Sequence, residues 1–176
     1  MAEESSSSCS AQATKKISLK TADGHLFEVE EPVAMEFEIV KSFFDENDDA
    51  SEDTVVPLPN VSAAPLSYII EFCRAHVEFR KKRSPKQEVK TFNEEFGKSK
   101  SNDELKEMIL VANYLNIKDM LDYLTETVAN RIKNKSVEYV RKFFGIENDF
   151  TPEEEEAARK EYEWAFEGVD PDDDDV

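Results

Sequence analysis

Apolar and polar residues alternate in two short stretches near the beginning of the patterned part of the chain, at 17–20 and 26–30. A period of two is typical of β-strands, and the Asp23-Gly24 pair between the stretches favours a tight hairpin turn. The run 55–58 predicts a third short strand, which its proline restricts to an edge or an end of a sheet. A small sheet is therefore expected near the beginning of the chain. Because the residues after it have helical spacing, the sequence predicts a fold of the α+β class.

Helical spacing predicts several helices in the rest of the N-terminal half. A short one begins near residue 31, and a second has an apolar face that includes Phe37 and Val40. A third follows Ser62, a residue type that caps helix N-termini. It carries Cys73 among its apolar positions.

Two charged stretches interrupt this pattern. The acidic run 45–53 is expected to form a loop, and the basic stretch 80–90 a mobile linker. A short apolar set then ends at Gly97. The expectations for the two charged stretches rest on their polarity alone.

The middle of the chain begins with a capping box at 101–104, Ser-Asn-Asp-Glu. The helix that it starts is apolar nearly all round, and Leu110 lies on its second apolar side. Such a helix is usually sandwiched between two layers. The next apolar stripe runs from 117 to 132 at helical spacing.

Two short helices are predicted after this stripe. Ser136 can cap the first, and Gly145 is placed to end it. Thr151, Pro152 and Glu154 form the start signal of the second. These helices carry many large apolar residues and have few layers to pack against. They either leave an apolar groove for a partner or complete a small core, and their pattern does not distinguish the two.

Charge excludes one broad class of partner. The 176 residues carry a formal net charge of −18, and about two-thirds of that charge lies in 147–176. So acidic a chain is repelled by nucleic-acid phosphates and by anionic membrane surfaces. No apolar run approaches the roughly 20 residues that span a bilayer. We therefore expect a soluble, intracellular protein that binds neither nucleic acid nor membrane.

Candidate catalytic or metal chemistry is sparse. Cys73 and His76 have the spacing of half a zinc site, but His25 is the only other histidine. The acidic runs lack the alternating ligands and central glycine of an EF-hand loop. We predict no catalytic residue, no metal site and no cofactor.

Five segments of the chain resemble hallmarks of the S-phase kinase-associated protein (Skp) family. They are 56–61 (VPLPNV), 109–118 (ILVANYLNIK), 127–130 (TVAN), 146–156 (IENDFTPEEEE) and 163–167 (EWAFE). The resemblance runs from about Lys16 to Glu167, and the order of the motifs is specific to that family.

The resemblance implies an adaptor of the SCF (Skp–cullin–F-box) ubiquitin ligases, which supports ubiquitin-dependent degradation and is not itself an enzyme. A BTB/POZ-like domain at 16–110 would bind a cullin, and a C-terminal helical extension at 111–167 would bind F-box proteins. A disordered leader at 1–15 and an acidic tail at 168–176 would flank them. The family also implies location in the nucleus and cytoplasm.

Individual site residues follow from the same resemblance. Asn113 and Tyr114 match positions that face the cullin. The expected F-box region runs from about Ile109 to Glu167, with Lys106 next to it. The residues expected to bind the F-box are Lys106, Ile109, Leu121, Leu124, Thr125, Val128, Ile132, Val140, Phe143, Phe144, Ile146, Trp164 and Phe166.

Departures from the family pattern concentrate near the F-box surface. Lys106 stands where members usually carry Phe, and Phe92 where they carry Trp. A basic stretch at 80–90 replaces a commonly acidic loop, and the tail 168–176 is added. The hypothesis is a divergent member with a restricted set of F-box partners. The alternative is a BTB-type acidic scaffold, or a chaperone of basic proteins, that has lost cullin or F-box binding.

Overall fold

The computed structural model describes residues 15–47 and 54–170, and it divides into two compact units. The sheet unit comprises 1–83 and 114–116, and the helical unit comprises 84–113 and 117–176. The predicted functional domains, 16–110 and 111–167, cut the chain at a different place and stay predictions.

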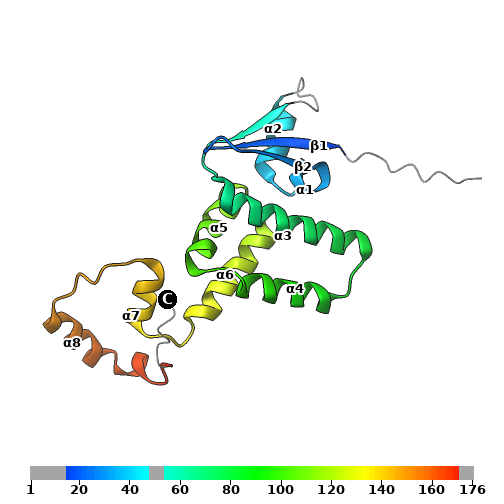
Figure 1. The fold of residues 1–176 in the computed structure, drawn as a ribbon. Coiled ribbons are helices and arrows are strands. Elements are labelled where there is room, and N and C mark those ends of the chain that lie inside the picture. The colour runs from blue at the N-terminus through cyan, green and yellow to red at the C-terminus, as the bar shows by residue number, and fades with distance from the viewer. Residues whose placement is uncertain (1–14, 48–53, 171–176) are drawn as a thin grey trace, which may run out of the picture. The chain divides into compact units, whose positions relative to one another are not determined.

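Within its described residues, the sheet unit contains three strands in the order β2-β1-β3 (Figure 1). Strand β1 (Lys16–Thr21) pairs antiparallel with β2 (Leu26–Glu30) and parallel with β3 (Val55–Leu58). Leu19 faces Phe27 on one side and Val56 on the other. The hairpin, the short third strand and the α+β class are therefore confirmed.

Three helices are described in the sheet unit besides the strands. They are α1 (Glu31–Ala34), α2 (Glu38–Glu46) and α3 (Ala63–Lys82). Their buried residues join those of the strands in one apolar core, whose fully buried members include Ile17, Leu19, Val29, Phe37, Val40, Val56, Leu58, Leu66 and Ile69.

The beginning of α3 is capped from a distance. Ser62 occupies the N-cap position, as predicted, but its side chain makes no capping hydrogen bond. The Ala63 N–H instead donates to Asp23 Oδ2 at 3.0 Å, and the Thr21 hydroxyl donates to the other oxygen of that carboxylate. These bonds, from Thr21 first and Ala63 second, lower the pKa of Asp23 from 3.8 to about 2. The hairpin turn is thereby tied to α3.

The helical unit contains α4 (Lys86–Lys98), α5 (Asn102–Tyr114), α6 (Lys118–Ile132), α7 (Val137–Phe144), α8 (Pro152–Glu161) and a 3₁₀ turn, η1 (Glu163–Phe166). The last residue of α5 falls in the sheet unit. Fully or nearly fully buried side chains in the helical unit include Phe96, Leu105, Met108, Met120, Leu124, Val128 and Phe143. Among the described residues, none of the helices has both the length and the apolar character to span a bilayer.

The three helix N-caps predicted in the second half of the chain, at Ser101, Ser136 and Thr151, are all present. Ser101 and Glu104 exchange side-chain to backbone hydrogen bonds, and so do Thr151 and Glu154. Ser136 accepts a bond from the Tyr139 N–H, and Gly145 ends α7 in the left-handed conformation with φ 66°. Local sequence signals therefore place these helix ends correctly.

The predicted linker at 80–90 is wrong for most of its length. Helix α3 continues to Lys82 and α4 begins at Lys86, so only 83–85 connects them. Lysine and arginine are good helix formers, and cations in the last turn of a helix are favoured by its dipole. The predicted acidic loop is wrong at Asp45 and Glu46, which end α2, while 48–53 lie outside the described residues.

Two further expectations fail inside helices. Gly97 does not end α4, which continues to Lys98. A side chain at Gly97 would collide with the Tyr123 hydroxyl and come within 3.0 Å of Thr127 Cγ2. The glycine therefore allows α4 and α6 to pack closely. Leu110 is 70% exposed, so α5 is not covered on all sides.

Candidate partner-binding surface

Helix α7 exposes one of two adjacent phenylalanines. Phe143 is buried, whereas Phe144 is 42% exposed, and their rings meet edge to face with centroids 4.9 Å apart. After Gly145 the chain turns back, and the Ile146 N–H donates to the Arg141 carbonyl oxygen at 2.8 Å. This turn leaves Ile146 exposed beside the end of α7.

Lys106 holds the C-terminal end of α7. Its ammonium donates to the Phe143 carbonyl oxygen at 2.7 Å and pairs with Asp103 Oδ1 at 2.7 Å. The same group lies 5.8 Å from the centroid of the Phe143 ring. A cation at a helix C-terminus is favoured by the helix dipole and supplies a donor to an otherwise unpaired carbonyl. Lys106 therefore connects α5 to α7.

Ion pairs connect α7 to α8. Arg159 pairs with Glu138, and Arg141 approaches Glu155 at 3.5 Å. Hydrogen bonds from Asn148 and Arg159, with the nearby arginines, lower the pKa of Glu155. A hollow of about 180 Å³ lies between the helices, lined by Val137, Arg141, Phe150, Glu155, Ala158, Arg159, Tyr162 and Phe166.

Large apolar side chains remain exposed over this part of the chain. Trp164, in η1, is 73% exposed. We call the following five residues the exposed apolar set: Phe144, Ile146, Phe150, Tyr162 and Trp164. Their number within one short region is typical of a surface that a partner covers.

The structure divides the predicted F-box residues into three groups. Leu124, Val128 and Phe143 are buried within the helical packing. Thr125, Phe144, Ile146 and Trp164 are exposed. The others are half-buried: Lys106, Ile109, Leu121, Ile132, Val140 and Phe166. Their roles in binding stay predictions.

The predicted site omits some exposed apolar residues. Phe150 and Tyr162 are exposed and border the hollow between α7 and α8. In the structure they lie next to the two ends of α8, Phe150 just before its capping Thr151 and Tyr162 just after Glu161. Leu110 is apolar in the sequence, but nothing in its helical pattern indicates exposure.

The two predicted cullin residues lie together at the end of α5. Asn113 is exposed and Tyr114 is half-buried. Their adjacency follows from the sequence, and their role stays a prediction.

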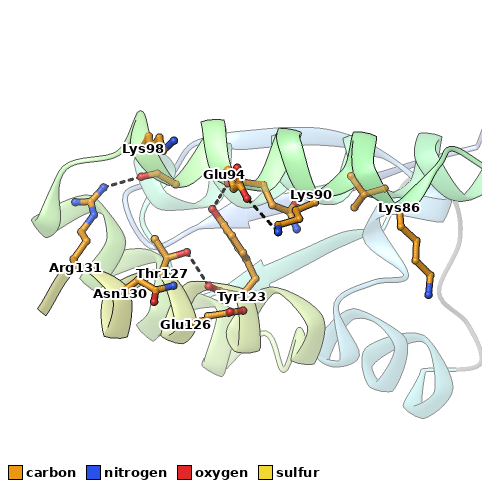
Figure 2. Close-up of a pocket in the computed structure, with 12 residues that line it drawn as sticks. Lys86, Lys90, Glu94, Lys98, Tyr123, Glu126, Thr127, Asn130 and Arg131 are labelled. Atoms are coloured by element: carbon orange, nitrogen blue, oxygen red, sulfur yellow. Dashed lines mark hydrogen bonds and ion pairs between the residues drawn. The ribbon is translucent and has the colours of Figure 1, made fainter. Parts of the chain in front are cut away.

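A larger groove of about 630 Å³ lies elsewhere in the helical unit, between α4 and α6 (Figure 2). None of the predicted site residues lines it. The Tyr123 hydroxyl donates to the Asn93 carbonyl oxygen across it, and burial raises the pKa of Tyr123. At one end, Arg131 on α6 donates to the carbonyl oxygens of Gly97 and Lys100 at 2.7 and 2.6 Å.

The candidate zinc pair has a different environment from a metal site. Cys73 is buried, and burial raises the pKa of its thiol to about 12. The His76 ring stacks on Phe72 with centroids 4.2 Å apart. Within 15–47 and 54–170, no group of three or more His, Cys, Asp or Glu side chains is arranged to hold a metal ion.

Comparison with known proteins identifies the family. Residues 15–78 match the "Skp1 family, tetramerisation domain", and residues 118–165 match the "Skp1 family, dimerisation domain". SKP1-like protein 20 of Oryza sativa subsp. japonica is 43% identical over 175 residues, which cover 89% of this chain and 98% of that protein. SKP1-like protein 14 of Arabidopsis thaliana is 46% identical over 155 residues, covering 88% and 99%. SKP1-like protein 1A of Arabidopsis thaliana is 44% identical over 162 residues, with the same coverage.

These matches confirm the predicted family. They agree with a small sheet domain followed by helices, and they support an adaptor role in SCF complexes in general terms. The chain belongs to the Skp1 family.

Proposed function

We propose that this chain bridges a cullin to F-box proteins in an SCF ubiquitin ligase and contributes no catalysis of its own. The cullin binds at the end of α5, through Asn113 and Tyr114. The F-box protein binds the C-terminal helices of the helical unit. The complex works in the nucleus and cytoplasm, which microscopy of the tagged full chain tests.

The exposure of Trp164 is the observation that carries the proposal. A tryptophan buries 150–250 Å² when it is covered, so leaving it 73% exposed is unfavourable unless a partner covers it. Tryptophan is also among the residue types most enriched at binding hot spots. Phe144 and Ile146 add exposed apolar surface.

Helix-in-groove recognition fits this region. The exposed apolar set is presented by α7, by the loop between α7 and α8, by Tyr162 at the end of α8 and by η1. Caps and ion pairs fix the ends of α7 and α8. A surface that is ordered before binding loses less conformational entropy on association. The polar side chains around it, Arg141 and Arg159 among them, can form the hydrated rim of such an interface.

Lys106 supports a restricted set of F-box partners. Its ammonium is engaged with the Phe143 carbonyl oxygen, so it influences the partner by setting the position of α7. Phe144 and Ile146, at and just beyond the end of that helix, would change place if the bond were lost. An F-box protein selected for a different arrangement would then bind less well.

The test is co-purification of the full chain with a cullin N-terminal domain and with an F-box domain. Trp164→Ala is expected to weaken F-box binding by about 2 kcal/mol, roughly thirtyfold, and to leave cullin binding unchanged. Leu26→Ala is the matched control, because Leu26 is also exposed but lies in the sheet unit.

Failure of the wild-type chain to bind either partner would overturn the proposal. Salt-sensitive binding to histones in its place would favour the acidic chaperone. Equal effects of Trp164→Ala and Leu26→Ala on F-box binding would overturn the assignment of the surface.

A further inference from the structure

The groove between α4 and α6 is lined by more cations than anions. Four basic side chains, Lys86, Lys90, Lys98 and Arg131, face two acidic ones, Glu94 and Glu126 (Figure 2). This balance is the reverse of the whole chain, whose net charge is −18. The groove is therefore a cationic feature on an acidic protein.

Three of the four cations form no ion pair within the described part of the chain, although Arg131 donates hydrogen bonds to the carbonyl oxygens of Gly97 and Lys100. Lys90 approaches Glu94 at 3.8 Å, but neither Lys86 nor Lys98 forms an ion pair with any residue that the structure describes. The remaining residues that line the groove are uncharged: Val89, Asn93, Gly97, Tyr123, Thr127 and Asn130. A segment rich in carboxylates would complement this lining.

The walls of the groove are fixed. Gly97 lets α4 approach Thr127 on α6, and Arg131 joins the end of α4 to α6 through the Gly97 carbonyl oxygen. The Tyr123 hydroxyl donates to the Asn93 carbonyl oxygen further along. An occupant would therefore enter a groove that exists before binding.

The described part of the chain ends at Asp170, which is hydrogen-bonded just beyond the C-terminal end of α6. The Asp170 N–H donates to the Asn134 carbonyl oxygen at 2.8 Å. Asn134 has a left-handed φ of 60° and follows the end of α6, about one helical turn beyond Asn130. The residues that follow Asp170 are Pro171 and the run 172–175, which consists of four aspartates.

We propose that the aspartate run 172–175 lies along the α4/α6 groove of its own chain and pairs with Lys98 and Lys90. The lengths agree. An extended chain covers about 3.3–3.6 Å per residue, so 172–175 reach roughly 7–17 Å beyond Asp170. Helix α6 rises about 1.5 Å per residue, so Asn130 and Tyr123 lie roughly 6 and 16 Å back from Asn134.

The covalent connection through Asp170 compensates for the weakness of the individual ion pairs. Ion pairs between exposed side chains are weak, and salt screens them. A short connection raises the effective concentration of the aspartates at the groove to about the millimolar range. The segment thereby occupies the groove, and another acidic partner has to displace it. This inference does not depend on the proposed adaptor role.

Paramagnetic broadening tests the proposal in the full chain. A Cys9→Ser, Val176→Cys variant carries a spin label at position 176, and buried Cys73 stays unlabelled because its pKa is raised to about 12. At low salt the amides of Gly97, Asn130 and Lys90 are expected to lose more than half of their intensity. About 0.5 M salt restores the intensity, because the Debye length falls to a few ångströms.

Matched variants test whether the broadening depends on ion pairs in the groove or only on the closeness of the C-terminal segment. Lys90→Gln with Lys98→Gln is expected to abolish the broadening, and so is replacement of the four aspartates by asparagine. Lys118→Gln with Lys142→Gln removes the same charge outside the groove and is expected to leave the broadening unchanged. Absence of broadening at low salt, or its persistence in the groove variant, overturns the proposal.

A mixed sample identifies which molecule supplies the aspartates. Isotope-labelled chain without a spin label is combined with unlabelled chain that carries one. Broadening of Gly97 and Asn130 in that mixture would show that a second copy fills the groove, and it would overturn the assignment to the same chain. Unchanged intensities in the mixture support it.

Discussion

The sheet unit and the segment from α7 to η1 differ in how far their large apolar side chains are buried. In the sheet unit, Leu19, Phe37 and Leu58 are fully buried in a shared core. In the segment 137–166, Phe143 is the only buried residue among those whose side chains the structure describes. Helix α8 buries none. The sheet unit therefore buries most of its large apolar residues, with Leu26 and Val55 as exposed exceptions, whereas the C-terminal segment leaves most of its own exposed.

The segment is ordered by polar interactions. Capping boxes contribute about 1 kcal/mol each, and exposed ion pairs such as Arg159–Glu138 contribute about 0–1 kcal/mol. Such contacts define helix ends and directions but bury little apolar surface. The comparison shows that a segment can have well-defined helices without burying its apolar side chains. Such exposed side chains on defined helices are available to a partner.

The largest expected effect is a difference in the free energy of unfolding between a substitution in the sheet unit and one in the C-terminal segment. Phe37→Ala is expected to lower the free energy of unfolding by about 3–5 kcal/mol, because it removes a fully buried ring from the core of the sheet unit. Trp164→Ala, although it removes a larger side chain, is expected to change it by less than about 0.5 kcal/mol. Urea denaturation followed by circular dichroism measures both.

Leu26→Ala is the control for this contrast. It removes an exposed apolar side chain from the sheet unit, so a small effect shows that burial, and not the choice of unit, determines the loss. Losses of similar size for Phe37→Ala and Trp164→Ala would mean that the free chain covers Trp164, and the comparison would be wrong.

A smaller effect is expected at Lys106. Lys106→Met keeps most of the apolar stem and removes the ammonium that donates to the Phe143 carbonyl oxygen. Loss of a hydrogen bond from a charged donor is expected to cost about 1.5 kcal/mol, and the amide signals of 143–146 should shift. Heteronuclear NMR and urea denaturation measure the two changes.

The conservative variant sharpens that result. Lys106→Arg retains the cation and is expected to preserve much of the contact with α7, whereas Lys106→Phe introduces the residue that the family resemblance leads us to expect at this position. If wild type and Lys106→Phe bind a panel of F-box domains with identical profiles, Lys106 does not restrict the repertoire.

The sequence predicts local features of the fold well. The hairpin at Asp23-Gly24 and the caps at Ser101, Ser136 and Thr151 each depend on residues close together in the chain. Their chemistry is the same wherever the segment packs. The family resemblance, carried by the order of five motifs, is confirmed by the comparisons.

Features that depend on distant residues could not be predicted in the same way. Asp23 caps α3 across 40 positions, and Gly97 is required by a close contact with α6. The exposure of Leu110 depends on what packs against α5, which helical periodicity does not contain. The sequence indicates the aspartate run at 172–175 only as part of a tail, because its tether at Asn134 is a contact between distant residues.

The smallest expected effect is a dependence on pH in the acid range. The folded pKa of Asp23 is about 2 and its ordinary value is 3.8, so the stabilising contribution is fully present above about pH 4. It is lost as the pH falls through the folded value. Asp23→Asn is therefore expected to flatten the decline in unfolding midpoint between about pH 4 and pH 2, measured by thermal denaturation.

Glu154 provides the matching test in the other region, because hydrogen bonds from the Thr151 backbone and hydroxyl also lower its pKa. The linkage has the same sign, but α8 buries no residue, so protonation of Glu154 should fray α8 without affecting the core. Glu154→Gln is expected to weaken the amide signals of 152–156 and to leave the global unfolding midpoint unchanged between about pH 4 and pH 2. If Glu154→Gln alters that midpoint as much as Asp23→Asn does, α8 is coupled to a core, and its apolar neighbours are not held open for a partner.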